Sequence, residues 1–466
     1  MLEVDGSVGA LRLLGDYAPE GDDAAFVQLA DRLRREIVAG TLAPGGRLPS
    51  ERAIATAVGL SRSTVVAALD LLRTEGFVES RQGSGTRVRF VGDRDAPAGH
   101  PGQVVDLGNT VIRPAAFVVD ELLELDRGEA IELVQMSDYS RSGLPQLRAA
   151  IATYYADFGL RTDPEAIFVT TGVQQALRLA LRVVTEPGTN VLLEEPSFAG
   201  AADTLRERNL RVTPVPRGPD GIDLEALERA FSITHARLLV IQPACHMPTG
   251  TTMPLPDRRD LLRICSRHQA TIIENASWND ATFANEPEPP IAALSPKVRT
   301  VTIGSANTIF WDGLSVAWVR TDPATTARMT STVSPGDFRA SIISQHATAR
   351  LLRHIDASRR ARRTELRANF EGLAAELRRS VPEWSYREPS GGASLWVRLP
   401  QSGATALTRT AMWSGVTAAA GTAFSSVHGL DDHLQFGFAT PFATTAPSVR
   451  TFIDVWRRHA ARAGHR

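Results

Sequence analysis

Lysine is almost absent from this sequence of 466 residues: of its 51 basic side chains other than histidine, only Lys297 is a lysine and the rest are arginines. Chemistry that forms an imine needs a side-chain amine, so the chain offers a single residue for it. Cysteine is equally scarce. Cys245 and Cys265 are too few for a disulfide framework and do not have a metal-ligand spacing. We therefore expect both to be small buried apolar residues and predict no metal site.

Long apolar runs are missing as well. The chain has no stretch of about 18 consecutive apolar residues, the length that suggests a transmembrane helix. Its acidic, proline-bearing N-terminus lacks the charged-then-apolar order of a secretion signal. We therefore expect a cytoplasmic protein without membrane contact. The length predicts two or three domains, and a net charge of −1 argues against a protein that coats nucleic acid indiscriminately.

The most informative local pattern is the segment LPSERAIATAVGLSRSTVVAALDLLRTEGFVESRQGSGTRV, residues 48–88. Ser50 is a typical helix N-cap, and Gly59 ends the helix that follows. A second helix starts after Ser61 and ends at Gly76. Two short β-prone runs then flank a glycine-rich turn, as in a hairpin. The pattern therefore predicts a helix-turn-helix followed by a β-hairpin wing.

The motifs LPSER, LSRSTVVAAL and EGFVESRQGSGTRV resemble the winged helix-turn-helix of GntR-type bacterial transcription regulators over residues 25–90. The resemblance implies that double-stranded DNA is the partner. Guanidinium and hydroxyl groups at the start of the second helix suit phosphate oxygens and base edges. Many family members carry a second arginine where Val66 stands, so one phosphate contact is expected to be missing. The predicted DNA-binding residues are Arg52, Ser61, Arg62, Ser63, Thr64, Gln82 and Gly83.

The segments on either side of this pattern set the expected domain limits. Residues 1–24 are expected to be a flexible leader, and residues 26–38 repeat apolar side chains at helical spacing. Residues 91–104 are rich in Asp, Pro and Gly and predict a linker. The remainder alternates helical patterns with short apolar runs, which predicts an α/β domain with a mostly parallel sheet. The candidate strands are residues 166–172, 190–195, 237–242, 270–275 and 298–304.

The character of the chain changes near residue 340. An arginine-rich helical stretch over residues 346–380 is followed by strand patterns at 394–399 and 433–439. We therefore predict a large α/β domain over residues 105–340 and a smaller α+β domain over residues 341–466.

Six segments of this region resemble, in order and spacing, the fold-type I aminotransferases, and specifically the aminotransferase-like half of MocR-type regulators. The implied architecture is a winged helix-turn-helix followed by a large, mostly parallel α/β domain and a smaller α+β domain. The segments are SGLPQLRAAIATYY, TTGVQQAL, EEPSFAG, PACHMPTG, PSGGASLWV and GVTAAAGTAF.

The resemblance fails where the family's chemistry lies. Its members hold pyridoxal phosphate (PLP) as a Schiff base on a lysine, and that position matches Thr308 here. A hydroxyl cannot form an imine. Lys297 lies eleven residues earlier, before a strand that rises ~3.3 Å per residue, so it is expected to lie over 20 Å away at the strand's other end.

Other positions differ from the family pattern too. Asn275 matches the aspartate at the pyridinium nitrogen, and Ser277 matches a tyrosine near the cofactor. Ser315 matches an arginine at the phosphate, and Gln435 matches the arginine that clamps a substrate carboxylate. The implied pocket has thus lost its charge complementarity.

Features of shape are retained at the same predicted pocket. Gly172, Val173 and Gln174 start a helix that could cradle an anion through backbone N–H groups. Phe198 is either a ring that stacks on a planar ligand or a core aromatic. His246 is expected to be a non-catalytic histidine satisfied by backbone groups.

Two classes of function remain in view. The first is a dimeric, sequence-specific transcription regulator whose aminotransferase-like half serves dimerisation and senses some small-molecule effector, with no cofactor predicted. A variant of it binds PLP without a covalent bond. The second is a PLP-dependent aminotransferase with an appended DNA reader, which the missing nucleophile argues against.

Overall fold

The structure is a computed structural model that describes residues 24–38, 42, 47–74, 77–81, 85–88, 104–123, 127–135, 141–333, 339–427 and 429–463. The predicted leader and linker lie outside these residues, apart from one terminal residue of each. The chain forms two compact units. The first unit comprises Met1–Asp106, Gly403–Thr417 and Ser448–Arg466, and the second comprises Leu107–Ser402 and Ala418–Pro447. The domain limits proposed at residues 90, 104 and 340 stay predictions.

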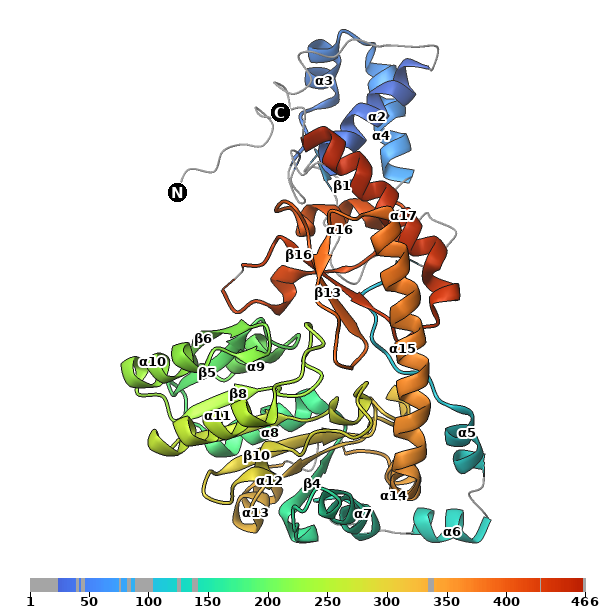
Figure 1. Cartoon of the computed structure of the whole chain (residues 1–466). Coiled ribbons are helices and arrows are strands. Elements are labelled where there is room, and N and C mark those ends of the chain that lie inside the picture. The colour runs from blue at the N-terminus through green and yellow to red at the C-terminus, as the bar shows by residue number, and fades with distance from the viewer. Residues whose placement is uncertain are drawn as a thin grey trace. The chain divides into compact units, whose positions relative to one another are not determined.

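The first unit contains the predicted helix-turn-helix, whose ends are set by its caps (Figure 1). The Ser50 hydroxyl accepts a hydrogen bond from Ala53 N at 3.2 Å, and Gly59 ends the next helix in the left-handed region at φ 69°. The two strands form an antiparallel wing. The elements are α2 (Ala25–Val38), α3 (Glu51–Val58), α4 (Arg62–Thr74), β1 (Val78–Arg81) and β2 (Gly85–Val88).

One apolar core holds these elements together. Leu29 and Leu33 from α2 meet Ile54 from α3 and Leu69 from α4, and all four are fully buried. The spacing of these residues is the helical periodicity read from the sequence. The wing closes the core with buried residues at its strand ends. The prediction of a winged helix-turn-helix is therefore confirmed.

The first unit also includes segments from the C-terminal part of the chain. Trp413 stacks on Phe77 with ring centroids 3.7 Å apart. Val105 and Asp106 pair in parallel with Val416 and Thr417. The elements are β3 (Val105–Asp106), α16 (Ala404–Met412), β14 (Val416–Thr417) and the part of α17 (Phe442–Ala463) from Ser448 onward.

The second unit is built on an eight-stranded mixed sheet in the order β4-β11-β10-β9-β8-β5-β6-β7. Four neighbouring pairs, from β10 across to β6, are parallel, and β11 runs antiparallel to both of its neighbours. The strands are β4 (Ile167–Thr170), β5 (Asn190–Glu195), β6 (Arg211–Gly218), β7 (Gly221–Ile222), β8 (Leu238–Ile241), β9 (Thr271–Asn275), β10 (Thr300–Ser305) and β11 (Ala317–Arg320).

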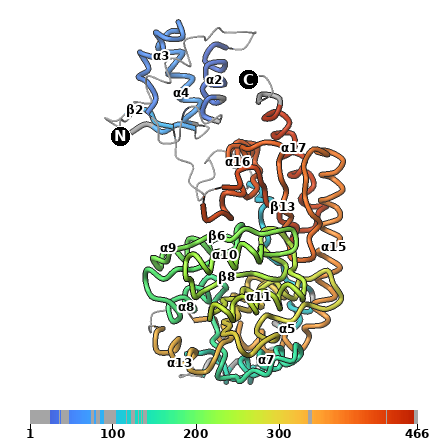
Figure 2. The backbone as a smooth tube through the Cα atoms, turned by 60° about the vertical axis from the view of Figure 1, so that its left-hand side comes forward, coloured from blue at the N-terminus to red at the C-terminus, as the bar shows by residue number. Residues whose placement is uncertain are grey.

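Helices cover both faces of this sheet (Figures 1 and 2). Val191 and Leu193 belong to one core cluster while Leu192 between them belongs to another, as expected for a strand buried on both faces. The helices of the unit are α5 (Ala116–Leu123), α6 (Arg127–Gln135), α7 (Pro145–Ala156), α8 (Val173–Val184), α9 (Ala201–Glu207), α10 (Leu224–Thr234), α11 (Leu255–Arg267), α12 (Ile291–Leu294), α13 (Pro323–Thr332), α14 (Ile342–Leu351) and α15 (Ile355–Ser380).

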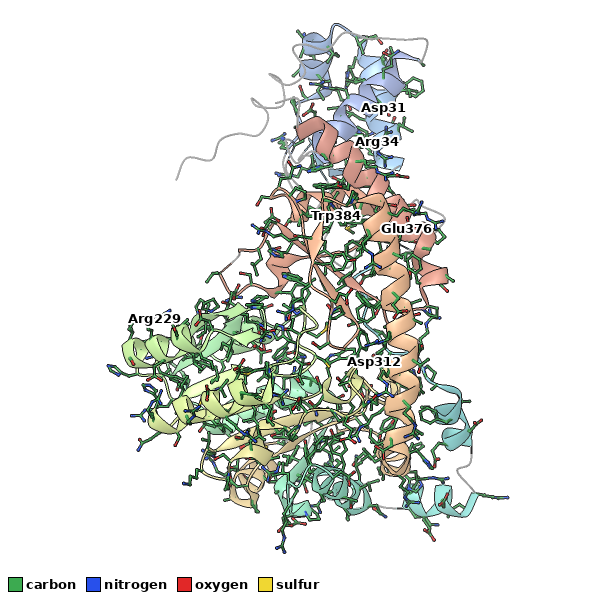
Figure 3. The ribbon with its side chains drawn as sticks, viewed as in Figure 1. Asp31, Arg34, Arg229, Asp312, Glu376 and Trp384 are labelled. Carbon is green, nitrogen blue, oxygen red and sulfur yellow. The ribbon has the colours of Figure 1, made fainter. Side chains whose placement is uncertain are left out.

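A smaller four-stranded sheet in the order β12-β13-β16-β15 packs near the end of α15. Trp384, which follows α15, lies with its ring 6.1 Å from that of Phe436 on β16, and Figure 3 labels it together with Glu376 of α15. The α15 helix has 26 residues and is the main part of the predicted arginine-rich stretch. The strands are β12 (Ser385–Tyr386), β13 (Ser394–Arg398), β15 (Ala419–Ala420) and β16 (His433–Gly437).

The candidate strands from the sequence all exist, and three strands of the large sheet, β6, β7 and β11, were not predicted. The strand β6 carries Pro214 and Pro216, which cannot donate ladder hydrogen bonds and which hide a strand signal. The four-residue strand β11 runs antiparallel to both of its neighbours. The predicted mostly parallel sheet is present, since β4, β5, β6, β8, β9 and β10 all run in one direction.

Three further observations bear on the expectations from composition. No single helix among the described residues has the length and apolar character to cross a membrane, although α3 and α4, bent by 114°, pass that test as a pair. The described residues contain no group of three His, Cys, Asp or Glu side chains that could hold a metal ion. Cys245 and Cys265 are both free and buried, as predicted, and burial raises the pKa of each to about 12.

Candidate functional sites

The start of α4 presents a cluster of hydroxyl groups to solvent. Ser61 caps the helix by accepting a hydrogen bond from Thr64 N at 3.1 Å. Its Oγ also lies 2.8 Å from Ser63 Oγ and 2.7 Å from Thr64 Oγ1. The three predicted hydroxyl residues are therefore brought together, with Ser61 and Ser63 exposed and Thr64 half-buried. Such groups can donate to phosphate oxygens or base edges.

Two predicted arginines lie beside this cluster. Arg52 is exposed on the first turn of α3, and Arg62 is the first residue of α4. The Arg62 guanidinium donates from Nε and Nη2 to Glu51 Oε2, at 3.2 Å and 3.0 Å. Glu51 is the first residue of α3 and the acidic residue of its first turn. Its contact with Arg62 depends on how α3 and α4 cross, which no local pattern shows.

The wing tip remains untested, because the predicted residues Gln82 and Gly83 lie outside the described part of the chain. The base of the wing adds Arg47, which the sequence reading missed. Leu48 N donates to Thr86 O at 2.9 Å, and the Arg47 guanidinium lies over Gly85. The only sequence signal for Arg47 was a positive charge close to the motif, which is too common to select it.

The predicted pocket residues in the second unit gather at one edge of the large sheet. Strands β10, β9, β8 and β5 are parallel, and β4 points the same way because β4 and β10 both pair antiparallel with β11. Their carboxyl ends therefore share an edge, where ligands commonly bind in such sheets. The predicted residues at this edge are Gly172, Val173, Gln174, Phe198, His246, Asn275, Ser277, Thr308 and Ser315.

Three of these residues are hydrogen-bonded to one another. The Thr308 hydroxyl donates to the backbone oxygen of Ser277, and Ser277 N donates to Asn275 Oδ1 at 3.1 Å. Asn275 Nδ2 donates to Gln242 Oε1 at 3.4 Å. Asn275 and Ser277 are buried. The side chains at positions 275 and 308 thus bond to neighbouring protein groups.

A buried ionic cluster adjoins this network and was missed by the sequence reading. Glu194, fully buried at the end of β5, pairs with Arg217 and accepts a hydrogen bond from Gln242 N at 2.6 Å. Burial raises the pKa of Glu194, but His246 and Arg217 outweigh it and lower the pKa overall. The sequence signal that could have predicted this cluster is a glutamate at the end of an apolar strand pattern. A carboxylate buried there requires a charged or hydrogen-bonding partner.

His246 belongs to the same cluster. Its Nδ1 lies 2.9 Å from Thr249 Oγ1, and its Nε2 lies 3.3 Å from Glu194 Oε1. Burial and the charge of Arg217 lower the pKa of His246 to about 4, so the ring is neutral near pH 7. The prediction that backbone groups satisfy this histidine was incomplete, because side chains flank both ring nitrogens.

The helix start that could cradle an anion is present at α8, with Gly172 as its N-cap. Gln174 is engaged on α9, since its Nε2 donates to Ala199 O at 2.8 Å and its Oε1 accepts from Thr204. The Phe198 side chain is buried and belongs to the core cluster that includes Phe168. Phe198 also lines a cavity together with Gly200 and Phe424, so both interpretations of this residue stay open.

Two predicted positions remain to be described, Ser315 at the same edge of the large sheet and Gln435 on the smaller sheet. Ser315 is exposed and takes a left-handed conformation at φ 52°. Gln435 lies on β16 between Trp396 and Ala419, is buried, and its Nε2 has no hydrogen-bond partner among the described residues. Lys297 is exposed and precedes the amino end of β10, whereas Thr308 follows its carboxyl end. The two residues therefore lie at opposite ends of this strand.

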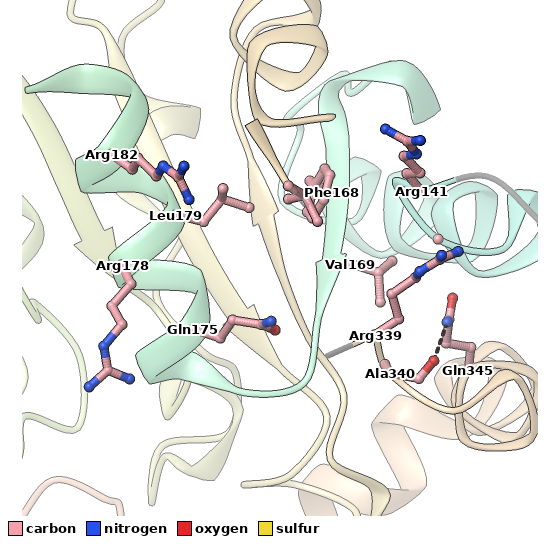
Figure 4. Close-up of a pocket in the computed structure, with 12 residues that line it drawn as sticks. Arg141, Phe168, Val169, Gln175, Arg178, Leu179, Arg182, Arg339, Ala340 and Gln345 are labelled. Atoms are coloured by element: carbon pink, nitrogen blue, oxygen red, sulfur yellow. Dashed lines mark hydrogen bonds between the residues drawn. The ribbon is translucent and has the colours of Figure 1, made fainter. Parts of the chain in front are cut away.

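A separate cavity of about 220 Å³ lies beside α8 (Figure 4). Its floor is apolar, with Phe168, Val169 and Leu179, and four arginines line it. One of them, Arg178, turns toward Glu207 and bonds to it at 3.0 Å. No predicted site residue lines this cavity. The arginines are Arg141, Arg178, Arg182 and Arg339.

Together, the two units define a winged helix-turn-helix joined to an aminotransferase fold. The chain belongs to the aminotransferase class I and II family, whose model matches residues 120–440. Residues 26–88 match the model of bacterial regulatory proteins of the gntR family. The chain is therefore a GntR-type regulator with an aminotransferase-like domain.

Similar proteins include both regulators and enzymes. The chain is 30% identical over 358 residues to the probable rhizopine catabolism regulatory protein MocR of Rhizobium meliloti, covering 69% of this chain and 70% of that protein. It is 30% identical to a 2-aminoadipate transaminase of Thermus thermophilus, and the match covers 64% of this chain and 75% of that protein. A solved alpha-aminoadipate aminotransferase, LysN of Thermus thermophilus, matches 77% of this chain and 93% of its own, with 27% identity and a TM-score of 0.71.

Proposed function

We propose that this protein is a dimeric, sequence-specific DNA-binding transcription regulator whose aminotransferase-like domain works without PLP bound as a Schiff base. That domain serves dimerisation and senses a small-molecule effector. The observation that carries the proposal is a contrast in hydrogen bonding. Donor groups at the start of α4 are exposed, while the Thr308 hydroxyl bonds to Ser277 O inside the protein.

The DNA-reading half of the proposal rests on chemistry and symmetry. The start of α4 offers one guanidinium and three hydroxyls within two turns of helix. A single reader of this size contacts too few base pairs to find one operator among genomic competitors. Two copies related by a two-fold axis would bind two half-sites, which is why we propose a homodimer on double-stranded DNA.

The residues at the sheet edge do not fit covalent PLP. Position 308 carries a hydroxyl, and Lys297, the chain's one lysine, lies at the other end of β10. Asn275 offers an uncharged amide where a pyridinium nitrogen would need a carboxylate. Ser315 brings no positive charge for a phosphate. The altered residues thus include the nucleophile and both charged partners.

A second candidate function is a regulator that binds PLP without a covalent bond. The helix start at Gly172 favours it, because its backbone N–H groups could still donate hydrogen bonds to a phosphate. A third, a working aminotransferase, has the similarity to a 2-aminoadipate transaminase in its favour. It lacks a side-chain amine at position 308, and we do not adopt it.

Three measurements test the proposal on the full-length protein. Selection from a random duplex pool should enrich one palindromic sequence, and sedimentation should give a dimer. Adding PLP and then borohydride should leave no cofactor covalently attached. A covalent adduct at the sheet edge would refute the second half, and failure to enrich any sequence would refute the first.

A further inference from the structure

The guanidinium of Arg62 is held from one side. Both of its contacts, from Nε and from Nη2, end on the same oxygen of Glu51, at 3.2 Å and 3.0 Å. Glu51 is the first residue of α3 and Arg62 the first of α4, so the pair joins the starts of the two helices across the turn.

Stability does not explain this pair. The Arg62 side chain is 74% exposed and that of Glu51 29% exposed. Ion pairs in such positions contribute little to folding, because water and salt screen them. Their lasting effect is on conformation: an arginine side chain that is free in solution must lose rotamer freedom when it binds, and a partner can remove that freedom in advance.

The geometry also selects which edge of the guanidinium stays available. Arginine has five N–H donors in a planar fork. Glu51 occupies the side formed by Nε and Nη2. The end formed by the two terminal nitrogens is left to donate, and two parallel donors at that spacing match the O6 and N7 acceptors of guanine.

We propose that Glu51 is a positioning residue for sequence recognition, which orients Arg62 end-on so that it selects guanine in the operator. The inference rests on the proposed function, in which α4 reads DNA. Glu51 itself carries a negative charge close to the DNA-facing helix, so it weakens attraction to any phosphate backbone. Glu51 thus increases the preference for the operator and lowers the affinity for DNA of any sequence.

This opposition of effects gives the experiment. Full-length wild-type protein and the Glu51→Gln variant are each used to select sequences from a random duplex pool, and affinities are then measured on the enriched duplex and on random DNA. We expect Glu51→Gln to reduce the preference for guanine over other bases at one position of each half-site roughly tenfold. Its affinity for random DNA should stay equal or rise.

Matched variants and a modified base separate positioning from other effects. Glu36 on α2 also pairs with an arginine, Arg32, at 3.1 Å, so Glu36→Gln removes the same charge from the same reader and should leave the base preference intact. Arg62→Lys keeps the charge but loses the fork, and should reduce the guanine preference as Glu51→Gln does. Replacing that guanine by 7-deazaguanine should weaken wild-type binding but hardly affect Glu51→Gln.

The outcomes are distinguishable. An unchanged guanine preference in Glu51→Gln would overturn the inference, as would equal losses on operator and random DNA together with a lowered melting temperature, which indicate a structural role. If the wild-type protein enriches no sequence, the proposed function itself has failed. If it enriches a sequence that has no guanine read by Arg62, only this inference is overturned.

Discussion

The two polar clusters of this protein differ in what their hydrogen bonds are used for. At the start of α4, Ser63 and Arg62 are exposed, although Ser63 also bonds to Ser61 and Arg62 to Glu51. At the edge of the large sheet, Asn275, Glu194 and His246 are buried. Gln242 bonds to both Asn275 and Glu194, and His246 lies beside Glu194. The first cluster is accessible to an external partner. The second makes its bonds inside the protein, although Arg217 Nε and His246 Nε2 have no hydrogen-bond partner among the described residues.

The comparison bears on how a cluster of residues at the sheet edge of an aminotransferase-like fold is interpreted. The positions at the sheet edge are still brought together by the parallel strands, so their spatial arrangement alone would suggest a working site. Their bonding argues otherwise, because a ligand would have to replace contacts already made inside the protein. The fold therefore determines where these residues lie, and their hydrogen bonds indicate whether they are available to a ligand.

The largest effect is expected from breaking the buried cluster. Glu194→Gln removes the carboxylate that neutralises Arg217, and an unpaired buried charge costs about 3–5 kcal/mol of stability. Urea unfolding of the second unit, followed by tryptophan fluorescence, measures this. The exposed pair of Glu207 with Arg178 is the control, since Glu207→Gln should leave the midpoint unchanged. Equal midpoints for both variants would contradict a structural role for the cluster.

The next effect is expected at the exposed cluster. Arg62→Ala should weaken binding to the selected operator by ~1–3 kcal/mol without altering the melting temperature. Gel-shift titration measures it, and Arg73→Ala at the other end of α4 serves as the control. Unchanged affinity for Arg62→Ala would mean that the first turn of α4 does not read bases, and the contrast between the two clusters would lose its exposed member.

A smaller effect should appear as a dependence on pH. The pKa of His246 is about 4 in the fold against 6.5 in the unfolded chain, so between these values only the unfolded state binds the proton. Stability should therefore fall as pH drops from 7 to 5, by about 2 kcal/mol from this residue. His246→Gln should remove that part of the acid sensitivity, as measured by urea midpoints at both pH values. An identical pH slope in the variant would show that His246 is not buried as a neutral ring.

The fold followed from the sequence to the extent that its signals were local. The winged helix-turn-helix could be predicted from caps such as Ser50 and Gly59 and from the periodic apolar residues of α4, because each of these signals acts within a few residues. The apolar runs placed β5, β8 and β9 in the same way. The strand β6 was hidden by its prolines, and the reversed direction of β11 depends on pairing between distant segments, which no local pattern encodes.

The sites followed less completely for a related reason. The motif positions lie together at one sheet edge, but Glu194, Gln242 and Arg217 were not predicted, because they make contacts between different strands. In the reader, the bond from Arg62 to Glu51 depends on the crossing of two helices. Sequence patterns relate residues within one helix or strand, whereas these contacts join residues of different helices or strands.

The smallest effect is expected where the family would place its nucleophile. Thr308→Lys introduces an amine at the end of β10, but Asn275 and Ser315 would still offer no charge to a cofactor's ring nitrogen or phosphate. We therefore expect no transamination above background when PLP and an amino acid are added, measured by keto-acid release. Borohydride trapping followed by mass spectrometry reports separately whether the new amine reacts at all. Turnover from this one substitution would mean that the sheet edge retains more of an active site than its internal hydrogen bonds indicate, and the contrast with the DNA-reading helix would then be one of degree.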